Sequence, residues 1–217
     1  MTSSASEAST TGLSSWSPSS RARTTARTRV VAEGAIGLVL AAGAGRRFGM
    51  PKALARTPDG SPWLHRAAMA LYDGGCDDVI VVLGAMAEAA IHLVPVDARI
   101  VVARRWGDGQ SASLLEGLEA CAASDGSAVV VTLVDLPDLD AGAVGRVLAG
   151  TGSGSLRRAS YDGAPGHPVL IGRDHWDAVA NRLSGDTGAA RYLAEHDAPW
   201  VDCSDLGGGA DIDRASA

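Results

Sequence analysis

The sequence predicts an α/β protein of three layers, in which helices cover both faces of a doubly wound, mostly parallel sheet. Three observations support this fold class. Short apolar runs alternate with segments whose apolar residues recur at helical spacing, the order that produces parallel strands joined by helices. A glycine-rich loop, Gly43–Gly49, follows the first run, and Asp135 directly follows the fourth. Both features therefore lie at the carboxyl ends of strands, where sheets of this kind bind ligands.

The chain up to Ala149 contains four apolar runs and four segments of helical periodicity. The runs are short and apolar, which is typical of buried strands. Strands are expected at Ile36–Ala41, Val79–Leu83, Arg99–Ala103 and Ala128–Val134. Helices are expected at Pro62–Tyr72, Met86–Leu93, Ser111–Ala123 and Ala141–Ala149. Gly74 and Gly75 follow the first helix, and glycine at that place is a common helix end.

Two further strands and two short helices complete the predicted elements. The strands Leu156–Tyr161 and Pro168–Ile171 are joined by a turn rich in glycine and proline. Helices follow over Arg173–Arg182 and Gly188–Glu195. The sequence contains no internal repeat, which agrees with a single domain.

Composition divides the chain into an extension and one domain. The first 34 residues are rich in Ser, Thr and Arg and poor in apolar surface, so we expect residues 1–34 to be a disordered N-terminal extension. A transit peptide would have a similar composition, but this segment lacks an amphipathic apolar face. Residues 35–217 suit one α/β domain. Hydrophobic residues make up 46% of the chain and aromatic residues 4%, so the core must consist of aliphatic side chains.

Charge and cysteine content exclude several classes of protein. The net charge of −6 is spread along the chain and argues against a nucleic-acid partner, which basic patches would hold. The three cysteines are far apart and form no CxxC motif, so neither a disulfide framework nor a zinc site is indicated, and we expect a cytoplasmic protein. No apolar run approaches the ~20 residues that a membrane span requires.

The loop after the first strand, Leu40-Ala-Ala-Gly-Ala-Gly-Arg-Arg-Phe-Gly-Met-Pro-Lys52, fits neither common phosphate-binding motif. A Rossmann fingerprint needs its third glycine one residue earlier than Gly49, and an acid at the end of the second strand, which here ends in Leu83-Gly84. A P-loop needs Gly-Lys-Ser/Thr, whereas the lysine here follows proline. A plain turn with surface cations is the remaining alternative.

Two properties of this loop favour an anionic ligand over a plain turn. Glycine leaves backbone N–H groups free to face an anion. Arg46, Arg47 and Lys52 add positive charge at the same place. A triphosphate is the anion that best suits such a loop.

The pattern LAAGxGxRxGxPK in this loop resembles the opening motif of the MobA-like NTP transferases, a family of nucleotide-diphospho-sugar transferase-like fold. The branch of molybdenum cofactor cytidylyltransferase is most similar, and the isoprenoid cytidylyltransferases are more distant. The resemblance implies catalytic roles for Arg47 and Lys52 at the NTP phosphates, with Lys52 at the α-phosphate. The Ala-Ala-Gly form is more similar to the cytidylyl than to the guanylyl enzymes. The resemblance also implies that the nucleotide is bound by the residues at the start of the loop, which are Leu40, Ala41, Ala42, Gly43, Gly45 and Arg46.

A second segment, Trp106–Gly117, resembles the family pattern Wxx-G-x-S-x-S-L-x-x-G. The resemblance adds Gly109, Ser111 and Ser113 to the nucleotide site. Either serine can cap the helix that follows, leaving its N–H groups for a base or phosphate. An ordinary capped helix is the alternative. Gly84, at the end of the second strand, is a weaker candidate for the same site.

Metal-binding carboxylates are expected at two places. Asp135 lies in a D-x-P sequence whose acid holds Mg²⁺ in the family, which also makes it a catalytic residue. Asp211 and Asp213 resemble the first two acids of the family's C-terminal D-x-D-T-P-E-D, but here the sequence continues Arg-Ala-Ser-Ala. Mg²⁺ takes oxygen ligands, commonly one or two carboxylates together with phosphates. A charged chain end is the alternative for the last two acids.

Two further motifs resemble the part of the family site that faces the acceptor substrate. Gly166, His167 and Pro168 match the end of G-x-x-G-H-P. Asp186 lies in Gly-Asp-Thr-Gly, which resembles GDxGAR with its arginine displaced by one residue, and it can equally be a helix N-cap. We therefore expect these four residues to bind the acceptor.

The resemblance implies that a nucleoside monophosphate, CMP from CTP, is transferred to a phosphorylated small molecule with release of pyrophosphate. Molybdenum cofactor is the expected acceptor, and a molybdoenzyme is a candidate partner. A phosphate nucleophile needs no strong general base, which suits motifs that supply cations and metal ligands only. The alternatives are a sugar-phosphate or isoprenoid nucleotidyltransferase, an inactive accessory protein that binds a nucleotide or cofactor, and, third, a Rossmann dehydrogenase.

Overall fold

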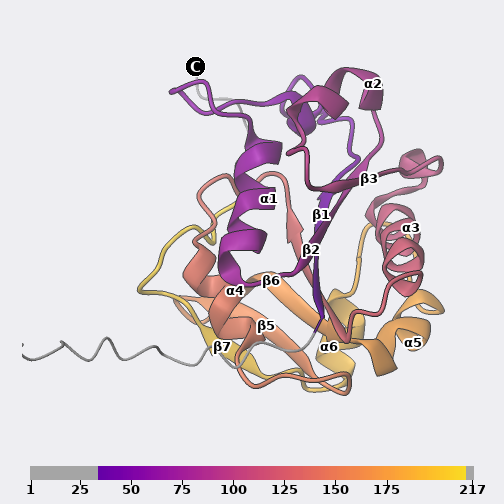
Figure 1. The fold of residues 1–217 in the computed structure, drawn as a ribbon, viewed down its shortest axis with the longest axis vertical. Helices are drawn as coiled ribbons and strands as arrows, with labels where there is room; N and C mark the ends of the chain where they lie inside the picture. Colours follow the sequence, from indigo (N-terminus) through magenta and orange to yellow (C-terminus); the bar gives the residue numbers. More distant parts are fainter. Residues whose placement is uncertain (1–33, 214–217) are drawn as a thin grey trace, which may run out of the picture.

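The computed structural model describes residues 34–213, which form one mixed sheet covered by helices on both faces (Figure 1). The predicted extension lies outside the described residues except for Gly34. The sheet has seven strands in the order β3-β2-β1-β4-β6-β5-β7. Their bounds are Ala35–Ala41 (β1), Asp78–Leu83 (β2), Arg99–Val102 (β3), Ala128–Leu133 (β4), Leu156–Tyr161 (β5), Ala164–Gly172 (β6) and Trp200–Asp202 (β7).

Strands β1 to β4 are parallel, so their carboxyl ends meet at one edge of the sheet. β6 runs antiparallel to both β4 and β5, and β7 runs parallel to β5. The register pairs Val131 with Val169 and Tyr161 with Ala164. The β5–β6 turn therefore reaches the same edge as the end of β4.

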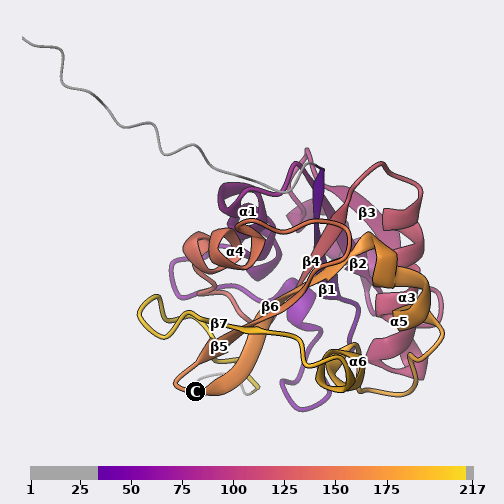
Figure 2. The same cartoon turned by 90° about the horizontal axis from the view of Figure 1, so that it is seen from below.

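Two layers of helices cover the sheet (Figure 2). α1 and α4 pack together on one face, and α3, α5 and α6 lie on the other. The helices are α1 (Trp63–Gly74), α2 (Ala87–Ala90), α3 (Gln110–Ala122), α4 (Ala141–Leu148), α5 (Trp176–Ala180) and α6 (Ala190–Glu195). Short 3₁₀ helices are η1 (Lys52–Leu54), η2 (Ile91–Leu93), η3 (Trp106–Asp108) and η4 (Arg173–His175). The predicted three-layer α/β fold is confirmed.

The central strands are buried on both faces, because each face carries its own layer of helices. Residues Val79 to Leu83 of β2 are fully inaccessible. Small residues bring the layers close: a Cβ added at Gly74 of α1 would lie 2.3 Å from the Val144 side chain of α4. The core is mostly aliphatic, as the composition predicts, and Trp63, Trp176 and Tyr192 are its buried aromatic residues among those described.

The structure differs from the predicted elements chiefly in the last third of the chain. The strand expected from Pro168 begins at Ala164, because the glycine- and proline-rich stretch itself pairs with the end of β5. The helix expected over Arg173–Arg182 is a 3₁₀ turn followed by the short α5. β7 was not predicted, since three residues with a mostly exposed pattern carry no periodicity.

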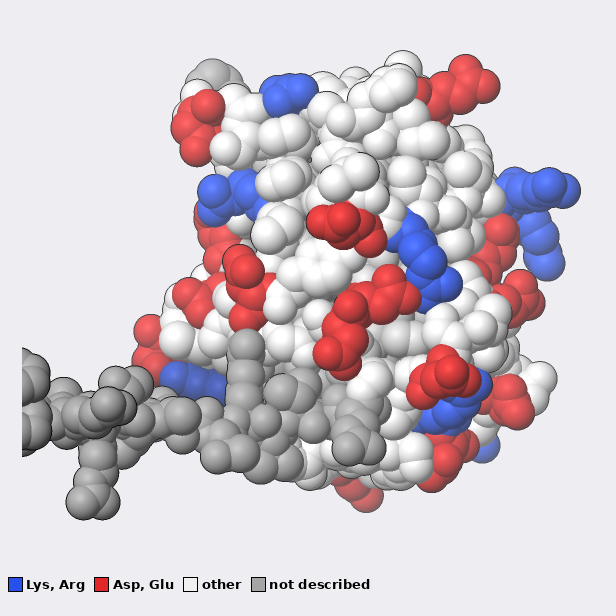
Figure 3. Space-filling model, viewed as in Figure 1, with Lys and Arg blue, Asp and Glu red and all other residues white. Residues whose placement is uncertain are grey.

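The charge distribution and the helix lengths bear on two of the sequence-based expectations. On the face seen in Figure 3, basic side chains form small separate groups among acidic ones, so this face has no extended basic surface for a nucleic-acid backbone. Within the described residues, every helix is too short or too polar to cross a membrane.

Candidate functional site

The glycine-rich loop, the start of α3 and the end of β4 enclose a cavity of about 540 Å³ at the carboxyl edge of the parallel strands. Most of the predicted nucleotide and metal residues line this cavity. They are Leu40, Ala41, Ala42, Gly43, Gly45, Arg46, Arg47, Lys52, Gly109, Ser113, Asp135 and Asp213, joined by the predicted acceptor residue Asp186.

Gly45 allows the loop to turn sharply, whereas Gly43 leaves its backbone accessible from the cavity. Gly45 has a φ of +60°, and a Cβ added there would lie 1.8 Å from the Met50 carbonyl oxygen. Its own carbonyl accepts a hydrogen bond from Gly49 N at 2.9 Å, so the chain turns back sharply before Lys52. A Cβ added at Gly43 would meet no atom within 4 Å. The backbone at Gly43 is therefore open to a ligand in the cavity.

Arg46 and Arg47 are exposed at the rim of the cavity, and no described acid pairs with either guanidinium. Free cations beside an open glycine backbone can contact several phosphate oxygens at once. This is the arrangement that the sequence predicted for a triphosphate.

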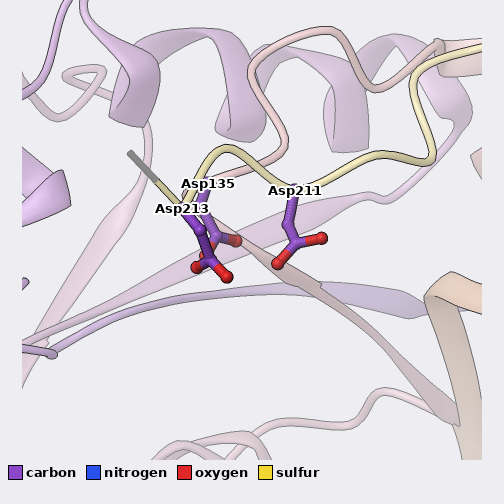
Figure 4. A group of neighbouring side chains, drawn as sticks. All are labelled: Asp135, Asp211 and Asp213. Atoms are coloured by element: carbon purple, nitrogen blue, oxygen red, sulfur yellow. The ribbon is translucent and has the colours of Figure 1, made fainter. Parts of the chain in front are cut away.

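Asp135, Asp211 and Asp213 offer one carboxylate oxygen each, and these oxygens lie within 4.8 Å of one another (Figure 4). Asp135 follows β4, and the other two come from the C-terminal segment that crosses beside it. The backbone N–H of Ile212 donates to the Asp135 carbonyl at 3.0 Å and fixes this segment at the end of β4. The structure thus brings together the three acids that the sequence predicted as metal ligands.

The amine of Lys52 lies between two of these carboxylates. It donates to Asp135 Oδ2 at 2.8 Å and to Asp213 Oδ1 at 3.0 Å. Burial alone would lower the pKa of Lys52, but the hydrogen bonds and charges of the two carboxylates outweigh it and raise the pKa above its usual value. The amine is therefore a cation at neutral pH.

The donor set fits a hard divalent cation. Three carboxylates and one ammonium leave a net negative charge, and all the candidate donors are oxygens, which Mg²⁺ prefers. Asp135 Oδ1 is buried and has no hydrogen-bond partner. A buried polar atom without a partner is costly and rare, so a cation on this oxygen would satisfy it.

Neither Ser111 nor Ser113 caps the start of α3, in contrast to the expectation from the sequence. Gly109 is the N-cap residue, and a Cβ there would lie 2.6 Å from Asp186 Oδ1. That carboxylate accepts a hydrogen bond from Gln110 N at 3.1 Å, and the Gly185 carbonyl accepts one from Ser111 N at 3.0 Å. A loop more than seventy residues along the chain therefore takes the first N–H groups of the helix.

Two of the predicted nucleotide residues support the site without lining it. Ser111 is buried, and its hydroxyl accepts a hydrogen bond from Gly188 N at 3.2 Å. A Cβ added at Gly84 would lie 2.5 Å from the Ala42 carbonyl oxygen and 2.7 Å from the Trp106 side chain. Gly84 thus permits close packing of the loops that follow β1 and β2.

His167, one of the predicted acceptor residues in β6, lines a smaller cavity of about 130 Å³, whose described lining does not include Gly166 or Pro168. Pro168 is buried in the strand, and Gly166 packs against the ring of Tyr161. Burial, with a further contribution from Arg158, lowers the pKa of His167 to about 4. The imidazole is neutral near pH 7 and can offer an uncharged hydrogen bond.

Sequence reasoning missed several residues of the two cavities. Gln110 lines both, and Trp106 and Asp108 line the larger one. All three lie within the recognised Trp106–Gly117 motif, so the adjacent motif residues could have indicated them. Arg158 and residues 187–190 line the smaller cavity. A charged residue in the middle of a predicted strand was the one available indication of Arg158.

Residues 37–200 match the sequence profile of the MobA-like NTP transferase domain. The chain belongs to this family. The resemblance found in the loop motif is thereby confirmed.

A curated relative of this MobA-like chain is the nicotine blue oxidoreductase of Paenarthrobacter nicotinovorans. It is 38% identical over 190 residues, which cover 82% of this chain and 91% of the relative. Its name is that of an oxidoreductase, so members of similar sequence carry names of different reaction classes.

Solved structures share the fold over most of the chain. A nucleotidyl transferase from Methanothermobacter thermautotrophicus superposes with a TM-score of 0.71 at 20% identity, covering 84% of this chain and 93% of its own. A protein from Mycobacterium tuberculosis gives a TM-score of 0.70 at 25% identity, with coverages of 83% and 93%. A manganese complex of the same Mycobacterium tuberculosis protein has a TM-score of 0.61 at 22% identity, with coverages of 78% and 86%.

Proposed function

We propose that this protein is a Mg²⁺-dependent nucleotidyltransferase that moves CMP from CTP to a phosphorylated small molecule, with molybdenum cofactor as the acceptor. The observation that carries the proposal is the meeting of two charged groups in one cavity. Arg46 and Arg47 of the open loop line the same cavity as the acids Asp135 and Asp213, and Lys52 is hydrogen-bonded to both acids. Cations that hold a triphosphate and acids that hold a metal are both needed for nucleotidyl transfer.

In this proposal the protein contributes mainly position and charge. The loop N–H groups, Arg46 and Arg47 hold the triphosphate, and the Lys52 ammonium counters charge that develops at the α-phosphate. Mg²⁺ on Asp135, Asp211 and Asp213 would neutralise phosphate oxygens. The acceptor phosphate attacks the α-phosphorus in line with the leaving pyrophosphate, and its second pKa of about 6 leaves it mostly dianionic at pH 7. A general base is therefore unnecessary.

The C-terminal acids favour an enzyme over the inactive accessory protein. The sequence departs from the family pattern after Asp213, which had raised that alternative. Support for the enzyme comes from geometry, since Ile212 N–H donates to the Asp135 carbonyl and carboxylate oxygens of Asp135, Asp211 and Asp213 lie within 4.8 Å of one another. The acids needed for a metal site are thus close enough to act together.

The choice of CTP and of molybdenum cofactor is tested by comparing substrates. With CTP, GTP, ATP and UTP at equal concentration, CTP should give the fastest pyrophosphate release in the presence of molybdenum cofactor. A clear preference for GTP would move the protein to the guanylyl branch. Release only with a sugar phosphate or methylerythritol phosphate would refute the cofactor as acceptor.

A second candidate function is oxidoreduction, which the name of the 38% identical relative favours. Such a reaction needs an electron donor, and a reduced nicotinamide dinucleotide has phosphates that the loop could hold. The late third glycine and the absence of an acid at the end of β2 weigh against it. Thermal melting distinguishes the two: stabilisation by NADH or NADPH, with none by CTP and Mg²⁺, would favour the oxidoreductase.

A further inference from the structure

The smaller cavity lies next to the larger one on the side of the sheet that α3 and α6 cover. Leu40, Gln110 and Leu133 line both cavities, so an occupant of the smaller one would lie beside the nucleotide. The remaining walls are mostly aliphatic, and Leu114, Val131, Val169 and Leu193 contribute to them. Apolar walls of this kind favour a flat, weakly hydrated group.

Arg158 is the one charged residue in the described lining of this cavity. The side chain is partly buried, its Nε donates to the Gly166 carbonyl at 3.2 Å, and no described acid forms an ion pair with it. Burial lowers the pKa of Arg158, in agreement with a guanidinium that is partly removed from water. A partly buried cation with no acidic partner among the described residues favours an anion, so a ligand that brings one would gain a charge-assisted hydrogen bond.

The neighbouring Arg157 shows that this arrangement is specific to Arg158. Its guanidinium donates to the carbonyls of Val147 and Ala149 on the α4 side of the sheet. Successive residues of a strand point to opposite faces. One arginine therefore anchors the end of a helix, while the other faces the cavity with its Nη groups available.

The remaining polar groups of the cavity carry no charge at neutral pH. His167 is neutral, and the hydroxyl of Thr187 already donates to the Ser184 carbonyl at 3.1 Å. These groups can orient a ligand but cannot neutralise an anion. The positive charge of Arg158 therefore dominates recognition inside the cavity.

We propose that this cavity receives a planar ring of the second substrate, with an anionic group on the ring paired to the Arg158 guanidinium. The volume is of the right order, because a cavity of about 150 Å³ with apolar walls holds a benzene ring. The identification of the ligand as the second substrate rests on the proposed function, but the binding chemistry does not.

Benzoate and benzamide test the binding chemistry without any nucleotide, because they share a ring and differ in charge. Each is titrated into the full chain, and binding is followed by methyl NMR at Val131, Val169 and Leu193. Benzoate should bind roughly tenfold more tightly than benzamide, as expected for a hydrogen-bonded charge. Arg158→Gln should remove this preference, and Arg158→Lys should keep part of it.

Arg157→Gln is the matched control, since it removes a charge from the same strand on the opposite face. It should leave the benzoate preference unchanged, and circular dichroism confirms that each variant is folded. Equal binding of the two fragments to the unaltered protein, shifts at other methyl groups, or an equal loss in Arg157→Gln would overturn the proposal. If benzoate bound in this cavity but the protein transferred no nucleotide, the proposed function would be refuted and the binding proposal would stand.

Discussion

Lys52 is the only lysine of the chain, and it bridges two carboxylates of the candidate metal centre. A cation placed between acids can hold them at a fixed separation and can also face a phosphate. The two roles have different consequences for activity. A purely binding cation affects KM, whereas a cation that meets charge developing in the transition state affects kcat.

We expect Lys52→Ala to lower kcat by roughly a hundredfold, the scale of one lost transition-state contact, with a much smaller rise in KM for the NTP. Steady-state pyrophosphate release measures both constants. Arg56→Ala, which removes an exposed cation whose guanidinium bonds the Gly60 carbonyl and no other described residue, should leave them nearly unchanged. A change confined to KM would show that Lys52 only binds the nucleotide.

Asp135→Asn should reduce turnover at saturating Mg²⁺ by at least about a hundredfold, because even outer partners of metal ligands commonly contribute 10–100-fold. Asp138→Asn is the control, since Asp138 lies close by in the chain and pairs with the partly exposed Arg66. Both variants should keep the far-ultraviolet circular dichroism of the parent. Near-normal turnover in Asp135→Asn would remove Asp135 from the metal site.

The low pKa of His167 predicts a loss of stability in acid. The pKa in the folded state is about 4, below the ordinary value of 6.5, so between these values the unfolded chain binds more protons. The free energy of unfolding should therefore fall as the pH drops from 6.5 to 4, and less so in His167→Gln. Urea midpoints across this range measure it, with His65→Gln, an exposed histidine, as control. Parallel pH profiles for the parent chain and His167→Gln would contradict the assignment.

At the scale of elements, the C-terminal segment completes the metal centre and depends on close backbone packing. Gly207 and Gly208 both have positive φ, +68° and +76°. A Cβ added at Gly208 would lie 2.1 Å from the Asp138 carbonyl oxygen, whereas one at Gly207 would meet nothing within 4 Å. The two glycines thus share backbone strain and differ only in contact.

Gly208→Ala should displace this segment and weaken Mn²⁺ binding by about tenfold, as loss of ligand support commonly does. Gly207→Ala should bind Mn²⁺ nearly as the parent does, because its new methyl group has space. Calorimetric titration with Mn²⁺ gives the affinities. If both variants lost affinity equally, backbone strain would explain the effect and the close contact at Gly208 would be irrelevant.

At the scale of the whole molecule, composition separates the N-terminal extension from the domain. Residues 1–34 are rich in Ser, Thr and Arg and poor in apolar surface, so we expect the residues before Val30 to be dispensable. A chain beginning at Val30 should show the melting temperature and turnover of the full chain. A large loss of either would show that the extension contributes to the folded domain.

Local patterns account for what could be predicted. Burial on both faces requires apolar runs, so β1, β2 and β4 were recognisable from hydrophobicity. The glycine-rich loop was recognisable because its glycines and cations are contiguous. β7 and the cap on α3 left no such pattern, since a three-residue strand has no periodicity and Asp186 is remote in sequence from Gln110.

The sequence by itself determined the layers of the sheet, the position of the loop at a strand end and the identity of the acids. Only the tertiary structure decided that Asp211 and Asp213 meet Asp135, and that Arg158 faces a cavity while Arg157 does not. The physical reason is the separation along the chain over which each kind of interaction acts. Periodicity and turn chemistry act between neighbours in the chain, whereas a carboxylate cluster or an unpaired cation depends on which distant segments pack together.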